Sequence, residues 1–188
     1  LISAFHKSLR ASDVDAALYY YGRMIDGGED PKYILRRMAA FASEDVGLAD
    51  PHCMVQVQAA WQAYERLGFP EGHLPLAQAI IYCATAPKSN AVNVALKKMT
   101  PIAQATGSMS PPMRMMNAPT KMMKDIGYSE GYQYDHDHKH AFSGQDCFPD
   151  ELGRQKFYTP NERGYEKEIS KRIEFWDTQR KSISKKKS

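Results

Sequence analysis

The sequence predicts an all-α protein, an antiparallel array of several helices followed by a long irregular segment and a final helix. Apolar residues recur at spacings of three and four through most of the first 107 residues, which is typical of helices with one buried face. Residues that start and stop helices bound these stretches. No segment alternates polar and apolar residues between turn residues, so we expect no sheet.

Residues 1–9 are expected to form a helix whose beginning lies upstream of this chain. Ser12 is the predicted N-cap of the second helix, since Asp15 follows it in a capping-box position. Two Asp-Pro pairs, Asp30-Pro31 and Asp50-Pro51, predict the starts of the third and fourth helices, because proline favours the first helical position. Glycines are expected to end the second, third and fourth helices, at Gly27-Gly28, Gly47 and Gly68 respectively.

The segment 72–86 is apolar on nearly all sides, so we place it at the centre of the array. A helix of about ten residues follows from Ala91, and Thr100-Pro101 is expected to restart or kink it before Gly107. A short helix is predicted after Pro119. The segment 128–160 shows little periodicity, and loops of this length tend to be functional or to wrap a surface.

Pro160-Asn161 is expected to open the final helix. Its predicted apolar face is formed by Tyr165, Ile169, Ile173 and Trp176. We therefore expect one helical domain over residues 1–178 and a basic, disordered tail over residues 179–188.

The charge is unevenly distributed, although the net charge is only +3. From Arg154 onward there are eleven Lys or Arg against five Asp or Glu, so the C-terminal end is basic and the rest mildly acidic. A basic end is a weak indication of nucleic-acid contact. The candidate contacts are Lys171, Arg172, Arg180, Lys181 and Lys185.

Two classes of protein receive no support from the composition. No apolar run approaches the roughly 18 residues that a membrane span requires, so no membrane partner is expected. The cysteines, Cys53, Cys83 and Cys147, are odd in number and widely spaced, which argues against a disulfide framework or a zinc ribbon.

Three histidines, His136, His138 and His140, alternate with charged residues between Asp135 and His140. Imidazole and carboxylate groups could bind a divalent metal. However, Lys139 would place a positive charge among the ligands, and a loop gives no independently positioned further ligand. We interpret the segment as a solvated loop and expect no resident metal.

No catalytic motif stands out in the sequence. The phosphate-binding pattern GxxxxGK[ST] is absent, as are GxGxxG and GxSxG. We therefore expect no catalytic residue and no cofactor in this chain. The acidic cluster Ser43-Glu44-Asp45 lies at a predicted helix C-terminus, where it opposes the helix dipole. It is either a partner contact or part of an internal ion-pair network with Arg36 or Arg37.

Four blocks occur in an order that resembles one known family. They are RRMAAFASEDVGLADP from Arg36, LAQAIIYCATAPKSNA from Leu76, NAPTKMMKDIGYSEGYQYDHD from Asn117 and KFYTPNERGYE from Lys156. Together they resemble the C-terminal domain of the RarA (MgsA) family, the replication-associated recombination AAA+ ATPases related to clamp loaders and to Werner helicase-interacting ATPase. The resemblance covers roughly residues 1–178.

This resemblance implies a helical domain that holds protomers together as a homo-tetramer. It implies that ATP and Mg are bound by another part of the parent polypeptide. The parent protein would be cytoplasmic, and nucleoid-associated if bacterial, with DNA and single-stranded-DNA-binding protein as its partners at stalled forks. The family-motif positions in this chain are Ser43, Glu44, Asp45, Lys88, Asn90 and Lys121.

The family usually has an HD pair followed closely by proline before the Ala-Phe pair. Here His138-Lys139-His140 precedes Ala141-Phe142, so the resemblance lends no support to a metal site. Two functions stay open: an oligomerisation domain, or a DNA- or protein-binding module that uses the basic final helix and tail.

Overall fold

The structure is a computed structural model that describes residues 1–187, and it divides into two compact units. Unit 1 comprises residues 1–96 and 158–170, and unit 2 comprises residues 97–157 together with the chain from residue 171 onward. The prediction of one domain over residues 1–178 stays a prediction beside this division into compact units. Among the residues whose burial is described, the buried hydrophobic ones all lie between Phe5 and Ala91, so the later part of the chain adds no residue to that core.

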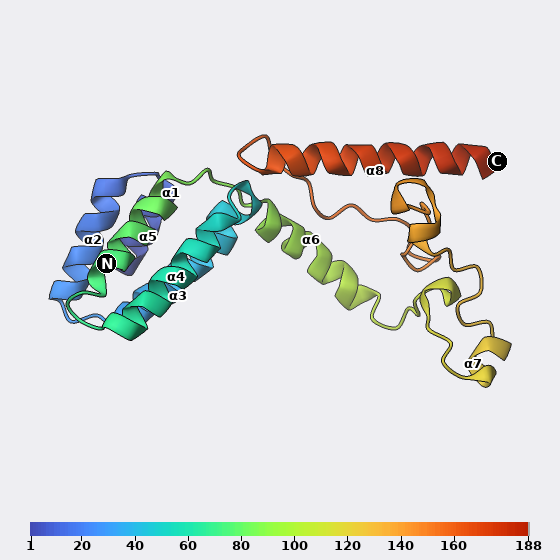
Figure 1. Ribbon diagram of the computed structural model, residues 1–188, viewed down its shortest axis with the longest axis horizontal. Coiled ribbons are helices and arrows are strands. Elements are labelled where there is room, and N and C mark those ends of the chain that lie inside the picture. Colours follow the sequence, from blue (N-terminus) through green and yellow to red (C-terminus); the bar gives the residue numbers. More distant parts are fainter. Residues whose placement is uncertain (188) are drawn as a thin grey trace. The chain divides into compact units, whose positions relative to one another are not determined.

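Five complete helices belong to unit 1, together with the first residues of two others, and Figure 1 labels them. They are α1 (Ile2–Arg10), α2 (Val14–Asp26), α3 (Pro31–Phe41), α4 (His52–Leu67) and α5 (His73–Thr85). The uncharged helix α5 packs against each of the other four, which confirms its central position. The all-α prediction is confirmed as well, because residues 1–187 contain no strand.

The helix starts follow the local capping chemistry. The carboxylate of Asp30 accepts a hydrogen bond of 2.9 Å from the backbone N–H of Lys32, and that of Asp50 accepts one of 3.0 Å from His52. Both caps were predicted. The cap of α2 is Asp13, which accepts from Ala16 N–H at 3.0 Å. Ser12 was the wrong choice, because its backbone has a left-handed φ of 59°.

Helix α6 (Ala91–Ala105) continues through Pro101, where the sequence predicted a restart or kink. Helix α8 (Glu166–Lys187) begins later than expected, because the chain before it turns to contact the bundle of unit 1. It also extends through residues predicted as a disordered tail. Ser188, the last residue of that tail, lies outside the described residues.

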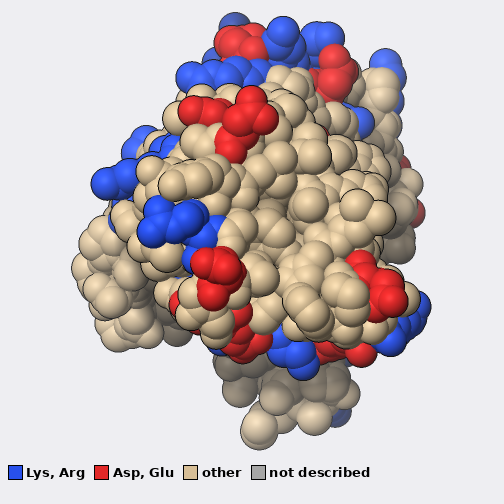
Figure 2. Space-filling view, turned by 90° about the vertical axis from the view of Figure 1, so that its left-hand side faces the viewer, with Lys and Arg blue, Asp and Glu red and all other residues tan. Residues whose placement is uncertain are grey.

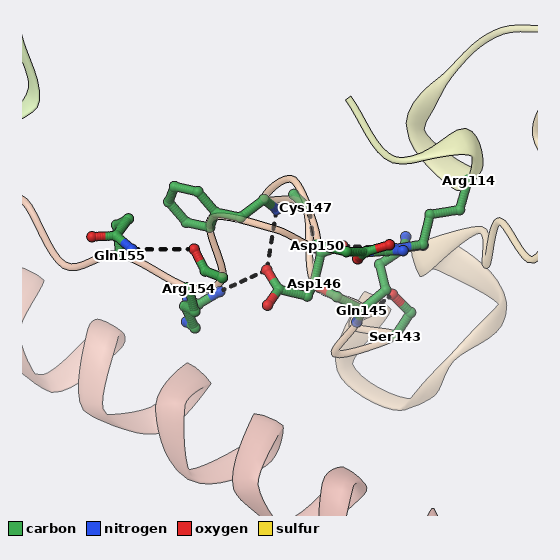
Figure 3. A network of polar contacts seen from close by, with 10 residues as sticks. Arg114, Ser143, Gln145, Asp146, Cys147, Asp150, Arg154 and Gln155 are labelled. Atoms are coloured by element: carbon green, nitrogen blue, oxygen red, sulfur yellow. Dashed lines mark hydrogen bonds and ion pairs between the residues drawn. The ribbon is translucent and has the colours of Figure 1, made fainter. Parts of the chain in front are cut away.

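In unit 2, the chain between α6 and α8 contains the short helix α7 (Lys121–Asp125) and three single turns, η3 (Met113–Met115), η4 (Asp135–Asp137) and η5 (Lys139–Ala141). The rest is irregular, as expected. Polar contacts link separate parts of it (Figure 3). Arg114 donates to the backbone oxygen of Asp146 and to the carboxylate of Asp150, both at 2.9 Å.

Aromatic contacts hold the part of α8 after residue 170 within unit 2. The ring of Phe142 lies 4.9 Å from that of Trp176, and the guanidinium of Arg180 lies 4.9 Å from the Phe142 ring centroid. This packing gives the predicted tail region a reason to stay helical. Within residues 1–187, none of the helices combines the length and hydropathy that a bilayer crossing needs.

Candidate functional site: a buried polar junction

The carboxylate of Asp45 is buried between α1 and the end of α3. Arg10 binds it with two hydrogen bonds, from Nε at 2.6 Å and from Nη2 at 3.1 Å. His6 Nε2 lies 3.1 Å from the same group. A buried carboxylate is stable only with such partners, and the paired geometry is the strong form of this contact. The hydrogen bond to Asp45 raises the pKa of Arg10 above its usual value.

His6 lies one helical turn before Arg10 on α1, and its ring packs edge-on against Phe41 at 5.3 Å. Its Nδ1 is buried with no partner in the described part of the chain. If the proton is on Nε2, this nitrogen donates to Asp45 and Nδ1 is left as a bare acceptor. That tautomer avoids burying an unpaired N–H.

Asp45 belongs to η1 (Ala42–Val46), a single π-helical turn that continues α3. Such turns are rare in proteins as a whole, but those that occur are often found at functional sites. Gly47 follows with a φ of 52°, and a Cβ there would lie 3.3 Å from the backbone oxygen of Ser89. η2 (Gly47–Ala49) then leads to α4. The sequence predicted a simple helix end here and gave no indication of the wider turn.

Lys88 caps the C-terminal end of α5. Its Nζ donates to the backbone oxygens of Ala84 at 2.9 Å and Ala86 at 2.5 Å, and to the hydroxyl of Ser12 at 3.1 Å. It also lies 5.9 Å from the ring centroid of Phe41. A cation is favoured here because the end of a helix presents unpaired carbonyl groups. Burial lowers the pKa of Lys88 from its ordinary value.

Glu166 is fully buried and lies at the first turn of α8. Its carboxylate accepts hydrogen bonds from the Ser89 hydroxyl at 2.6 Å, the Tyr158 hydroxyl at 2.7 Å and the backbone N–H of Asn161 at 3.2 Å. Burial and the neighbouring carboxylate raise the pKa of Tyr158. The Ser89 N–H donates to the Asp45 backbone oxygen at 2.7 Å, which joins the two buried carboxyl clusters.

The loop before α8 adds backbone contacts to the same region. Tyr165 N–H donates to the Ala49 oxygen at 2.8 Å, and Arg163 Nη1 donates to the Lys88 oxygen at 2.9 Å. A Cβ on Gly164 would lie 2.0 Å from the Ala49 oxygen, so only glycine fits. We call this set the polar junction: His6, Arg10, Asp45, Lys88, Ser89, Tyr158 and Glu166. These contacts hold distant segments of the chain together, because every carboxylate oxygen in the polar junction has a hydrogen-bond partner.

The structure brings together only part of the predicted site. Asp45 and Lys88 belong to the polar junction. Ser43 and Glu44 are exposed on the same turn, Asn90 is exposed beside Ser89, and Lys121 lies in unit 2. The cation that compensates Asp45 is Arg10, where the sequence suggested Arg36 or Arg37. His6 and Arg10 belong to the polar junction but were not predicted from the sequence, although their spacing of four residues places them on one helix face and could have indicated them.

The predicted loop histidines do not converge. The ring of His136 packs on Tyr134 at 5.2 Å, and that of His140 packs on Phe175 at 5.4 Å. The Asp135 carboxylate accepts from Ser143 N–H at 2.9 Å and from its hydroxyl at 2.8 Å, which lowers the pKa of Asp135. His138 is exposed. Among the described residues, these histidines form no group with metal-ligand spacing.

His6, Glu44 and Asp45 have potential ligand atoms within 4.8 Å of one another. Both Asp45 oxygens are already bound by Arg10, however. A metal ion would have to displace a guanidinium group from a buried carboxylate, so this cluster is an ion-pair site.

The predicted DNA contacts on α8 differ in their surroundings. Lys181 and Lys185 are exposed, as are Lys171 and Arg172. Arg180 is half-buried against Phe142, and burial lowers its pKa. In unit 2 Arg180 therefore packs on Phe142, and its contact with DNA stays a prediction.

The five-helix bundle and its polar junction define an all-helical domain, and comparison with known proteins gives its family. Residues 11–177 match the family described as MgsA AAA+ ATPase C terminal. The chain belongs to this family, which confirms the resemblance in the four sequence blocks.

Curated relatives agree with this family. The chain is 46% identical over 176 residues to replication-associated recombination protein A of Coxiella burnetii, covering 93% of this chain and 40% of that protein. It is 47% identical over 174 residues to the Escherichia coli K12 protein of the same name, covering 92% and 39%. It is 40% identical over 163 residues to ATPase WRNIP1 of Dictyostelium discoideum, covering 84% and 18%. The chain thus spans about two fifths of the length of these bacterial relatives.

Proposed function

We propose that this chain is the self-association domain of an AAA+ ATPase that acts in replication-associated recombination. The family match and the names of the relatives support the cellular role. The relatives are more than twice as long as the matched region, which leaves room for a nucleotide-binding part. In this proposal ATP and Mg are bound there, and the chain described here holds the protomers together.

The observation that carries the proposal is the outer face of α5. This helix has no Asp, Glu, Lys or Arg, although one side of it faces outward. Leu74 is 76% exposed and Ile81 is 43% exposed, seven residues apart on the same face. The groove between α4 and α5 continues this surface, with a volume of about 230 Å³ and a lining of Gln and Ala residues and Pro75. Contiguous apolar surface of this kind marks an interaction site.

The charge pattern favours a second copy of this chain as the occupant. Figure 2 shows a broad area without charged side chains on the face that lies at the left of Figure 1, with acidic and basic side chains around it. A two-fold interface must complement itself, so a rim that contains both signs of charge suits it. Obligate interfaces of this kind are large and apolar at their centre. The family resemblance favours a tetramer.

The test compares charged substitutions on and off this face. Leu74→Asp and Ile81→Asp should each shift the mass measured by light scattering after gel filtration toward 21.3 kDa, the mass of one chain. Met122→Asp is the matched control, because Met122 is 66% exposed, between the values for Leu74 and Ile81, but belongs to unit 2. Assembly that persists in both α5 variants would exclude α5 as the interface, and loss of assembly in the control as well would show that the effect is not specific to α5.

A second candidate function is DNA contact through the end of α8, with DNA and single-stranded-DNA-binding protein as partners of the parent protein. The exposed positions Lys181 and Lys185 favour it. Double substitution to Gln should weaken binding of a single-stranded oligonucleotide and reduce its salt dependence. Substitution is preferable to truncation, because Arg180 and Ile183 contact Phe142 and the region of Gly144. Unchanged binding would remove this candidate.

A further inference from the structure

A pocket of about 390 Å³ opens between α1 and α3, next to the polar junction. From α1 it is lined by Ser3, Lys7 and Arg10, which are spaced four and three residues apart on one helix face. From α3 it is lined by Tyr33 and Arg37, which are also four residues apart. The volume lies within the range of pockets that hold small ligands. Both helices belong to unit 1.

Two of the lining cations have no acidic partner. The side chains of Lys7 and Arg37 make no hydrogen bond or ion pair within the described part of the chain, and both are exposed. Neighbouring cations on α3 are compensated. Lys32 lies 3.3 Å from Glu65, and Arg36 lies 4.0 Å from Asp30. On these two helices, the cations without an acidic partner are therefore the two that line the pocket.

Arg10 gives the pocket a third cation in a fixed position. Asp45 holds its Nε and Nη2, and the side chain is half exposed. The guanidinium group has five N–H donors, so Nη1 stays available to a ligand. Because Asp45 neutralises the charge of Arg10, the net charge of the pocket is set by Lys7 and Arg37 and by one opposing carboxylate. That carboxylate is Glu44, which is exposed and also lines the pocket.

We propose that this pocket binds a phosphate group. Arg37 and Lys7 supply charge-assisted donors, and Arg10 presents a guanidinium edge that is already oriented. The hydroxyls of Ser3 and Tyr33 can donate to further phosphate oxygens. The phosphate belongs either to a free nucleotide-like ligand or to a nucleic-acid strand. The site is separate from the α5 face, so its failure would leave the self-association proposal intact.

The experiment uses the 188-residue chain with two probes: pyrophosphate, followed by calorimetry, and fluorescein-labelled dT12, followed by anisotropy. Lys7→Gln and Arg37→Gln should each weaken binding about tenfold, as expected for the loss of one charge-assisted contact. Arg36→Gln is the control, because Arg36 is the neighbouring cation that Asp30 compensates, and it should change binding less than twofold. Glu44→Gln should tighten binding, because it removes the opposing charge.

The two probes distinguish the sources of the phosphate. If pyrophosphate binds and dT12 binds no more tightly than pyrophosphate does, the ligand is a free phosphate compound. Tighter binding of dT12, with a salt dependence that falls by about one for each lost cation, identifies a strand. Equal binding of glutamate would show a general carboxylate site and overturn the proposal. It is also overturned if neither probe binds, or if the Lys7 and Arg37 variants behave like the Arg36 variant.

Discussion

The carboxylate of Glu166 accepts a 2.6 Å hydrogen bond from the hydroxyl of Ser89, which lies 77 residues earlier in the chain. This contact ties the start of α8 to the segment between α5 and α6. Because Ser89 also donates from its backbone to Asp45, the same residue links both buried carboxyl clusters of unit 1. The polar junction therefore holds together segments that are far apart in sequence.

Replacement of Glu166 should destabilise unit 1 strongly. Glu166→Ala removes the acceptor of the Ser89 hydroxyl, the Tyr158 hydroxyl and the Asn161 N–H, and leaves buried donors unpaired. We expect a loss of about 2–4 kcal/mol in the free energy of unfolding, measured by urea denaturation. The control is Glu162→Ala, an exposed glutamate, which should change stability by less than about 0.5 kcal/mol. Equal effects of the two changes would contradict the role of Glu166.

Stability should fall in alkaline solution partly because of Tyr21. Its hydroxyl lies 2.5 Å from His73 Nδ1, and burial raises its pKa to about 12, from 10.0 in a model compound. The folded state therefore keeps the proton while the unfolded chain loses it, so this contribution is present below pH 10 and is lost as pH rises through 12.

The measurement compares the wild-type chain with Tyr21→Phe. The wild type should lose up to about 2–3 kcal/mol more stability than the variant between these pH values. Tyr132→Phe, an exposed tyrosine, is the control and should follow the wild type. A Tyr21→Phe curve that runs parallel to the wild type would show that Tyr21 does not contribute.

Arg180 should stabilise unit 2. Its guanidinium stacks on Phe142, so Arg180→Ala should lower the stability of unit 2 by about 1 kcal/mol. Fluorescence of Trp176, which contacts Phe142, reports on this region in a Trp61→Phe background, because the chain has two tryptophans. Lys181→Ala should leave the transition in place. If both variants unfold like the parent chain, the Arg180 contact does not matter for stability.

The cysteines should differ sharply in reactivity. Cys53 and Cys83 are buried with their sulfurs 3.5 Å apart, whereas Cys147 is exposed. A disulfide-exchange reagent should therefore modify Cys147 rapidly in the native chain, and all three cysteines after unfolding. Cys147→Ser should remove the fast reaction. Rapid modification of the buried pair in this variant would mean that α4 and α5 separate readily.

The local features of the fold could be predicted from sequence, and the long-range ones could not. Asp30 and Asp50 were identifiable as caps because a cap acts on residues two or three positions away. The central place of α5 followed from its lack of charge. By contrast, Arg10 meets Asp45 across 35 residues, and nothing near either position signals the pairing. The sequence therefore assigned the compensating charge to the nearby Arg36 or Arg37.

The two units also explain where sequence reasoning failed. Composition predicted a disordered tail after residue 178, since that segment is polar and basic. Its helix depends on contacts that Arg180 and Trp176 make with Phe142, which composition cannot reveal. Likewise, the histidines of the irregular segment were a conspicuous motif, yet two of them pack on aromatic rings.

The most direct test of the account is sedimentation equilibrium of the 188-residue chain over a dilution series in the micromolar range. If the α5 face joins copies of this chain, the mass should be a multiple of 21.3 kDa and fall toward that value on dilution. A mass of 21.3 kDa at every concentration would contradict the proposal that this domain assembles the protein.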